Sequence, residues 1–339
     1  MSRIKIAQLG TTHEHANGKF QTVQMLPELF ELVGVVDDFS TTTAARFPCQ
    51  QDCYRDIPRL TREELLHYPG LQAVCVETPN NELVASAIPC MERGLHIHLD
   101  KPAGEDLNLF QTLLDGCRQR QLHLQMGYMF RGNPAMQLAT SAIRAGWIGE
   151  VFEIQADMSH NYGGDKYQEY LGNFRGGIAY NLICHLIDFV TPILGRPTAV
   201  HSLLKSTPGL SEQIKNNCLI ILEYQYATAT LRACSRETAG GGGRRLKISG
   251  TKGYFELCPL EHFDGQPLQM TMKLVEGNDR YAAGLHTLDL GVQKDRYLNQ
   301  LTEFARLIQH EKPSADLFQH DRLVHEIILA AAGYTGWRA

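Results

Sequence analysis

The chain has 339 residues, of which 37 are Asp or Glu and 32 are Lys or Arg, giving a formal net charge of −5. That length exceeds one ordinary domain and fits two, each able to bury its own core. The mildly acidic balance excludes a global positive field that would gather nucleic acid or anionic lipid. We therefore expect neither a nucleic-acid nor a membrane partner, and a small neutral or lightly charged ligand.

The N-terminal segment and the cysteines together indicate a cytoplasmic protein. Only a short apolar run precedes Thr11 and His13, far less than a signal peptide or a spanning helix requires. The nine cysteines are an odd number, scattered through predicted strands and helices, which favours reduced thiols over a disulfide framework. Cys49 and Cys53 have no second pair nearby, so we predict a loop there and no metal site.

The first part of the chain alternates short apolar runs with amphipathic stretches, which predicts a parallel sheet covered by helices. Helix boundaries follow from a capping box at Thr61 with Glu64, and from Gly94 and Gly146 after helices that begin near Asn81 and Asn133. The expected strands are Ile4 to Leu9, Leu32 to Val36, Ala73 to Val76, His96 to Leu99 and His123 to Met126. A further helix, from Glu105 to Arg120, carries one apolar stripe. We predict that residues 1–126 form an α/β domain with a doubly wound parallel sheet.

Strands dominate after Val151, so residues 127–339 are predicted to form an α+β domain with a largely antiparallel open sheet. The expected strands are Val151 to Met158, Val200 to Lys205, Cys218 to Tyr226, Thr228 to Cys234, Leu246 to Ser249 and Met270 to Leu274. The expected helices are Gly177 to Leu194, Asp295 to His310 and His320 to about Trp337. The last helix could pack back toward the first domain, and Gly240 to Gly243 reads as a flexible hairpin tip.

A dinucleotide site is predicted where the first strand turns into a helix, as in a Rossmann fold. The turn begins at Gly10, but Thr12 and His15 occupy the second and third glycine positions of the G-x-G-x-x-G fingerprint. Asp37 ends the second strand, 22 positions beyond His15, where a carboxylate accepts hydrogen bonds from the adenosine ribose.

Asp38 follows Asp37, and no basic residue stands beside the pair in sequence, so NAD is expected rather than NADP. The alternative is that the two aspartates merely end a strand in a turn. His13 and His15 either donate toward the pyrophosphate or point into the cleft, or they are solvated residues in the first turn of a helix.

Four further stretches resemble the glucose-fructose oxidoreductase, inositol dehydrogenase and rhizopine-catabolism (Gfo/Idh/MocA) family, and the likeness extends along nearly the whole chain. They are Val76-Glu77-Thr78-Pro79-Asn80, Asp100-Lys101-Pro102, Gly127-Tyr128-Met129-Phe130-Arg131, and the segment from Gly176 to Asp188 that matches G-G-x-x-x-D-x-G-x-H-x-x-D. The chain departs from the family at Leu83, where histidine is usual, at Asn181, where a catalytic Asp is usual, and at Ile183, where Gly is usual.

The resemblance implies an NAD-binding Rossmann domain followed by a substrate domain, and it identifies residues of both sites. The implied cofactor-binding residues are Gly10, Thr11, Thr12, His13, Asp37, Asp38, Thr78, Pro79, Asn80, Asp100, Lys101 and Met129. The implied catalytic residues are Lys101, His185 and Asn181. Residues expected to bind substrate are Lys101, His160, Tyr162, Arg175, Asn181 and His185; for His160, Tyr162, Arg175 and their neighbour Asn161, an exposed loop position is the equal alternative.

The chemistry of these side chains fits oxidation of an alcohol. Lys101 follows an apolar strand end, where a partly desolvated ammonium could stabilise developing alkoxide charge. Asn181 and His185 lie four residues apart on one predicted helix face, which Asp188 shares. His185 could take the hydroxyl proton, whereas Asn181 can orient but cannot relay a proton. The alternative for His185 is a hydrogen-bonded histidine that packs on the sheet.

Three functions follow as hypotheses. The first is an NAD-dependent dehydrogenase acting on a secondary hydroxyl of a sugar, cyclitol or related polyol. The second is a non-redox glycosidase or lyase that retains NAD, and the third is a cofactor-binding sensor or regulator that has lost catalysis. The second-domain sheet is also expected to form a homodimer or homotetramer interface, since a broad uncovered sheet face needs a partner.

Overall fold

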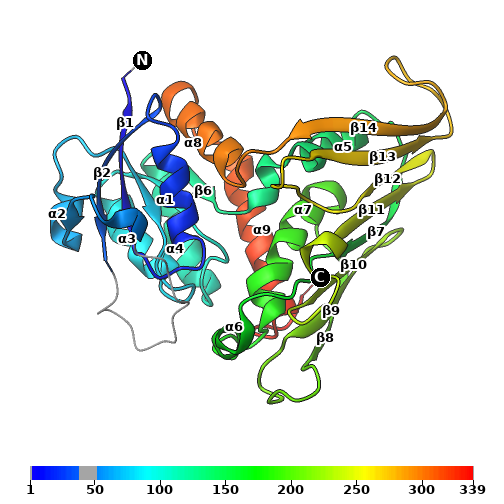
Figure 1. Cartoon of the computed structure of the whole chain (residues 1–339), viewed down its shortest axis with the longest axis horizontal. Coiled ribbons are helices and arrows are strands. Elements are labelled where there is room, and N and C mark those ends of the chain that lie inside the picture. The colour runs from blue at the N-terminus through cyan, green and yellow to red at the C-terminus, as the bar shows by residue number, and fades with distance from the viewer. Residues whose placement is uncertain (1, 38–51, 339) are drawn as a thin grey trace. The chain divides into compact units, whose positions relative to one another are not determined.

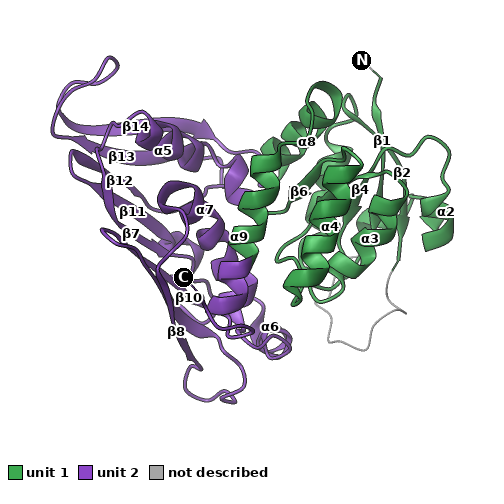
Figure 2. Cartoon of the chain, turned by 180° about the vertical axis from the view of Figure 1, so that it is seen from behind, with its two compact units in different colours: residues 1–128, 297–325 green, residues 129–296, 326–339 purple. Residues whose placement is uncertain are grey.

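The computed structural model describes residues 2–37 and 52–338, and the chain divides into two compact units. Unit 1 contains Met1–Tyr128 and Tyr297–His325, and unit 2 contains Met129–Arg296 and Glu326–Ala339 (Figure 2). The sequence had placed every residue after 126 in the second domain, whereas the structure assigns residues 297–325 to unit 1. Asp38 and Cys49 lie outside the described residues.

Unit 1 is built on a six-stranded parallel sheet in the order β3-β2-β1-β4-β5-β6 (Figure 1). This is the strand order of a Rossmann fold. Its strands are β1 (Ile4–Leu9), β2 (Phe30–Val36), β3 (Arg59–Leu60), β4 (Ala73–Val76), β5 (His96–Leu99) and β6 (Leu124–Met126). Its helices are α1 (Ala16–Gln24), α2 (Arg62–Leu66), α3 (Leu83–Glu92), α4 (Leu107–Gln119) and α8 (Leu298–His310), and a 3-10 turn spans Asp52–Tyr54. The predicted capping box of Thr61 and Glu64 starts α2.

Helix α8 belongs to unit 1 because its apolar face completes that unit's core. Leu301 and Phe304 of α8 pack with Ile6 of β1, Val23 of α1 and Cys75 of β4. A side-chain amide adds to this attachment, since Gln300 Nε2 donates to the Met126 carbonyl over 2.8 Å. Sequence periodicity predicted this helix correctly, but an amphipathic stripe does not reveal which sheet it will cover.

Unit 2 is built on an eight-stranded sheet in the order β14-β13-β12-β11-β7-β10-β9-β8. Neighbouring strands are antiparallel except β7 and β10, which are parallel. Its strands are β7 (Val151–Asp157), β8 (Ala199–Lys205), β9 (Asn217–Glu223), β10 (Thr228–Cys234), β11 (Arg245–Gly250), β12 (Gly253–Leu257), β13 (Pro267–Leu274) and β14 (Gly284–Val292). Strands β12 and β14 were not predicted.

The described helices of unit 2 lie on one face of this sheet (Figures 1 and 2). They are α5 (Pro134–Arg144), α6 (Gly164–Leu171), α7 (Cys184–Leu194) and the end of α9 (Ala315–Ala331), which passes from unit 1 into unit 2 at residue 326. Strands such as β9 and β13 alternate buried and partly exposed residues, as expected of a sheet covered on one side. Two 3-10 turns span Met129–Gly132 and Gly240–Gly243.

The long helix predicted from Gly177 to Leu194 is two helical segments. Ala179–Ile183 forms a π-helical turn, and the α-helix α7 follows from Cys184. Apolar periodicity does not distinguish these forms, because both bury nearly every residue of this segment. Elsewhere, no described helix is both long enough and apolar enough to cross a membrane.

Candidate functional site

Several residues predicted to bind the cofactor lie at the carboxyl edge of the unit 1 sheet, where open α/β folds bind their ligands. Gly10 follows β1, Asp37 follows β2, and Asp100 and Lys101 follow β5. Gly10 has φ +97°, and a Cβ there would lie 2.6 Å from the Thr78 backbone nitrogen. Glycine therefore allows the first turn to pack directly on the end of β4.

Asp37 is exposed at the end of β2, and a neighbouring hydroxyl orients its carboxylate. Its carboxylate accepts a hydrogen bond from Thr11 Oγ1 over 3.1 Å and is exposed. The structure also brings Arg59 of β3 beside it, with Nη1 3.5 Å from Asp37 Oδ2. No basic residue neighbours Asp37 in the sequence, but strand pairing brings Arg59 to it from a distant position.

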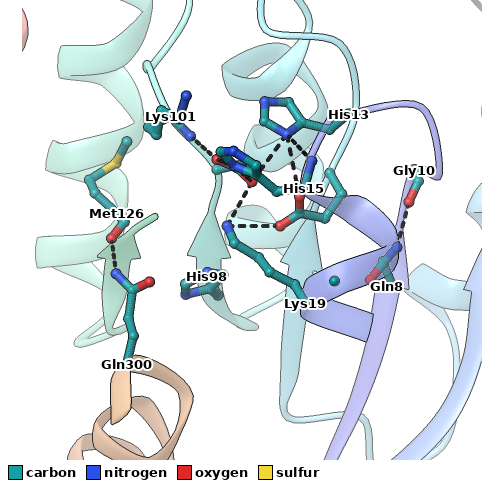
Figure 3. A network of polar contacts seen from close by, with 12 residues as sticks. Gln8, Gly10, His13, His15, Lys19, His98, Lys101, Met126 and Gln300 are labelled. Atoms are coloured by element: carbon teal, nitrogen blue, oxygen red, sulfur yellow. Dashed lines mark hydrogen bonds and ion pairs between the residues drawn. The ribbon is translucent and has the colours of Figure 1, made fainter. Parts of the chain in front are cut away.

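A fully buried charge network lies beneath this edge (Figure 3). Lys19 Nζ of α1 contacts Asp100 Oδ2 at 2.7 Å and Glu77 Oε1 at 3.1 Å, and all three side chains are 0% exposed. His13 Nδ1 and His15 Nδ1 each lie 3.1 Å from the same Asp100 oxygen. The two histidines are therefore structural partners of Asp100, an arrangement that neither sequence-based alternative described.

The network shifts the pKa values of its two carboxyl groups, Asp100 and Glu77, in opposite directions. Burial alone would raise both pKa values, but His13, Lys19 and His15 hold the pKa of Asp100 well below its usual range. The pKa of Glu77 is raised by burial and then by the neighbouring Asp100 charge. Burial lowers the pKa of His15 to about 4, despite the opposing pull of Asp100, so its imidazole is neutral near pH 7.

His13, His15 and Asp100 are close enough together to coordinate a metal ion. The Lys19 ammonium, however, already lies 2.7 Å from the Asp100 oxygen that both imidazoles contact. A divalent cation at that point would be repelled by this buried positive charge. We therefore assign the cluster to hydrogen bonding and charge pairing.

Lys101 is held at both its backbone and its side chain. Its backbone N–H donates to Asp100 Oδ1 over 2.6 Å, and its carbonyl accepts from Asn80 Nδ2 over 3.1 Å. Its Nζ donates to Glu14 Oε1 over 3.2 Å, and the Lys101 side chain is 0% exposed. The motif residue is thus a buried, oriented ammonium and not a solvated lysine on the sheet rim.

In unit 2, Asn181 and His185 lie on consecutive helical segments. Asn181 is on the π-helical turn and His185 on the first turn of α7, and both are buried. Asn181 Nδ2 donates to the Tyr167 hydroxyl over 3.0 Å, and the His185 ring lies 5.7 Å from the Phe130 ring. π-helical turns occur often at functional sites.

The predicted substrate residues separate into two groups. His160 is buried, stacks on Tyr162 with 3.5 Å between ring centroids, and lies 5.1 Å from the Tyr167 ring. These residues and Asn181 therefore form one polar aromatic cluster. Arg175 is exposed, and its backbone N–H donates to the Tyr334 hydroxyl. Met129, which was predicted to bind the cofactor and not the substrate, is buried in the 3-10 turn that opens unit 2.

Asp188 has a structural contact that its motif position did not indicate. Arg131 Nε donates to both of its carboxylate oxygens over 3.1 and 3.0 Å. Asp188 belongs to α7, and Arg131 belongs to the 3-10 turn Met129–Gly132. Two of the sequence landmarks are therefore joined by an ion pair. This pair fixes the helix that carries His185.

Five residues of these networks were not among the predicted site residues: Glu14, Lys19, Arg59, Glu77 and Tyr167. A signal existed for Lys19, because it occupies the apolar stripe of α1 between Ala16, Phe20 and Val23, where a lysine needs a buried partner. Tyr167 could not be found because α6 was not predicted. Arg59 and Glu14 required the tertiary contacts themselves.

Two family models match the chain. Residues 5–128 match an oxidoreductase family with an NAD-binding Rossmann fold, and residues 136–256 match the GFO/IDH/MocA C-terminal domain. Together these matches cover more than half of the chain.

Curated relatives include oxidoreductases of different substrates. An uncharacterized oxidoreductase of Schizosaccharomyces pombe is 24% identical over 75% of this chain and 70% of its own length. The scyllo-inositol 2-dehydrogenase (NAD(+)) of Bacillus subtilis is 26% identical over 59% of this chain and 58% of its own length. Levoglucosan dehydrogenase of Pseudarthrobacter phenanthrenivorans is 24% identical over 41% of this chain, and the match spans 37% of that relative.

Solved structures share the fold over nearly the full chain. A levoglucosan dehydrogenase in complex with NADH and levoglucosan has a TM-score of 0.79 at 15% identity, covering 97% of this chain and 96% of that one. A 3-ketoreductase from Actinomadura kijaniata, in complex with TDP-benzene and NADP, has a TM-score of 0.75 at 14% identity, covering 98% of both chains. At these identities the likeness establishes the architecture alone.

Proposed function

Since this chain belongs to the Gfo/Idh/MocA family of oxidoreductases with an NAD-binding Rossmann fold, we propose that it is a sugar or polyol dehydrogenase. It would oxidise a secondary hydroxyl of a sugar, cyclitol or related polyol, or reduce the corresponding ketone. The observation that carries the proposal is the buried Lys101 ammonium, oriented at the ligand-binding edge of the sheet. Relatives named for scyllo-inositol and levoglucosan support the substrate class.

In this proposal each catalytic side chain has one task. Lys101 donates a hydrogen bond to the reacting oxygen and stabilises its negative charge as the proton leaves. His185 accepts that proton in oxidation and returns it in reduction. Asn181 orients the substrate through its amide, which Tyr167 holds in place. The bound nicotinamide cofactor supplies the hydride acceptor.

We propose NAD as the preferred cofactor, with NADP as the weaker one. The exposed Asp37 carboxylate, oriented by Thr11, suits the two free hydroxyls of an NAD ribose and repels a 2′-phosphate. Arg59 beside it reduces this discrimination by offering a positive charge. Relatives with NAD and with NADP in their names both occur.

The polar aromatic cluster of His160, Tyr162, Tyr167 and Asn181 is the proposed substrate-recognition surface of unit 2. Aromatic faces and amide or imidazole groups suit a sugar, because its ring presents apolar C–H groups and hydroxyls together. We also propose that the uncovered face of the unit 2 sheet forms a homodimer or homotetramer interface. Partly exposed apolar residues on that face, including Leu203, Leu219 and Ile221, support this.

The deciding experiment follows NADH absorbance while purified protein and NAD are mixed with a panel of sugars, inositols and sugar acids. We expect NADH to accumulate with at least one compound, and Lys101→Ala to abolish the signal while NAD still binds. Binding of NAD without NADH formation across the panel would refute the dehydrogenase.

A further inference from the structure

Glu14 lies in the turn between β1 and α1, where a dinucleotide fingerprint calls for no acidic residue. Its Oε1 lies 3.2 Å from Lys101 Nζ, with the glutamate side chain 9% exposed and the lysine 0%. The two residues are 87 positions apart in sequence, so only the fold brings them together.

The charges around Glu14 divide into two paired sets. Lys19 is compensated by Asp100 and Glu77, at 2.7 and 3.1 Å. Lys101 is compensated by Glu14, at 3.2 Å. Each buried ammonium therefore has its own carboxylate partner, which matters because desolvation favours the uncharged amine.

Glu14 keeps its negative charge in this environment. Burial opposes ionisation, but Lys101, His15 and His13 lower the pKa of Glu14 to about 2. His15 Nε2 lies 3.6 Å from Glu14 Oε1, and because burial keeps that imidazole neutral, it does not neutralise the carboxylate. The Glu14 charge is thus available to Lys101.

We propose that Glu14 is a positioning residue for Lys101: its carboxylate fixes the ammonium at the sheet edge and keeps it charged. Lys101 then acts as a hydrogen-bond donor and a fixed positive charge, and not as a proton acceptor. The role of Lys101 in turnover rests on the proposed function above, whereas the Glu14–Lys101 pairing does not.

The experiment compares Glu14→Gln, which removes the charge at nearly constant shape, with Glu14→Asp, which keeps it. Glu28→Gln is the matched control, because Glu28 is an exposed residue of the same unit. The first readout is carbamylation by cyanate, in which the uncharged amine adds to cyanic acid to form a substituted urea. Peptide mass spectrometry gives the rate at Lys101 relative to exposed Lys312 in the same sample.

We expect Glu14→Gln to accelerate Lys101 carbamylation at pH 8 by about tenfold, since a lost carboxylate favours the reactive amine. Glu14→Asp should change the rate by less than about threefold because its charge remains. Glu28→Gln should leave it unchanged. Equal Lys101 rates in wild type and Glu14→Gln would overturn the inference.

The second readout uses whichever polyol supports turnover in the panel. Glu14→Gln should lower kcat by about tenfold or more with little change in the KM for NAD, and Glu14→Asp should recover most of it. The alkaline limb of the pH profile should move to lower pH, because loss of the Glu14 carboxylate favours the uncharged Lys101 amine. If wild type shows no turnover, the proposed function fails, and carbamylation still decides the role of Glu14.

Discussion

At the scale of single residues, strand pairing and long side chains bring together charges that the sequence keeps apart. Arg59 reaches Asp37 through the pairing of β2 with β3, and Lys19 reaches Asp100 from α1. The motif residue Asp100 is thus supported by Lys19, a residue outside any motif. The effect of Arg59 on Asp37 can be tested through the preference for NAD over NADP.

We predict that Asp37→Ala raises the affinity for NADP relative to NAD by about tenfold or more, the effect of removing one close repulsive charge. Arg59 becomes free to contact a 2′-phosphate once its carboxylate partner is gone. The double variant Asp37→Ala/Arg59→Gln should therefore lose the gain. Binding titrations with NAD and NADP measure both effects, and an NADP gain that survives in the double variant contradicts the role given to Arg59.

At the scale of elements, an ion pair fixes the helix that carries His185. Arg131 of the 3-10 turn and Asp188 of α7 pair with the aspartate side chain only 3% exposed. Removing Arg131 would take a two-point donor away from this buried carboxylate, which costs far more than losing a surface pair.

We predict that Arg131→Met lowers the free energy of unfolding by about 3–5 kcal/mol. Arg118→Met, which breaks the exposed pair with Asp115, should cost less than about 1 kcal/mol. Urea denaturation measures both. Comparable losses in the two variants would show that the Arg131–Asp188 pair is not the constraint on α7.

At the scale of the whole molecule, buried neutral histidines make the folded state sensitive to acid. Burial lowers the pKa of His96 to about 4 and those of His98 and His325 to about 3. A depressed folded-state pKa contributes stability above the unfolded value near 6.5 and loses it as pH falls toward the folded value. The protein should therefore lose stability between pH 6.5 and 4.

His325 isolates one such contribution. It is 0% exposed against the Phe110 ring, and neither of its ring nitrogens has a hydrogen-bond partner within residues 2–37 and 52–338. His325→Leu should reduce the loss of unfolding free energy between pH 7 and 4.5 by about 2–3 kcal/mol. Urea midpoints of variant and wild type at both pH values test this, and parallel declines would exclude His325 as a source of acid sensitivity.

The uncovered sheet face of unit 2 predicts the assembly state. Light scattering coupled to size-exclusion chromatography should report a dimer or tetramer. Leu203→Glu, on the outer face of β8, should shift the protein to a smaller species, since a buried unpaired charge opposes association. Val275→Glu, beyond the end of β13, is the exposed control. A monomeric wild type would contradict the interface proposal.

The sequence by itself determined the family, the two-domain plan and the positions of most helices and strands. Short apolar runs between amphipathic stretches specify a parallel sheet, and motif order predicts Lys101, Asn181 and His185 as catalytic residues. Both are local patterns of residue polarity and spacing, which can be read from one sequence. Strand β12 escaped prediction because it is only five residues long, and β14 because nearly all its residues are partly or fully exposed.

Only the tertiary structure decided which charges meet. Glu14 and Lys101 are 87 residues apart, and Lys19 and Asp100 are 81 apart, so no local pattern records their pairing. The same holds for α8, whose apolar face could have covered either sheet, and for the π-helical turn at Asn181, which has the same burial as an α-helix. Electrostatic partners depend on three-dimensional distance and shared burial, and chain folding sets both.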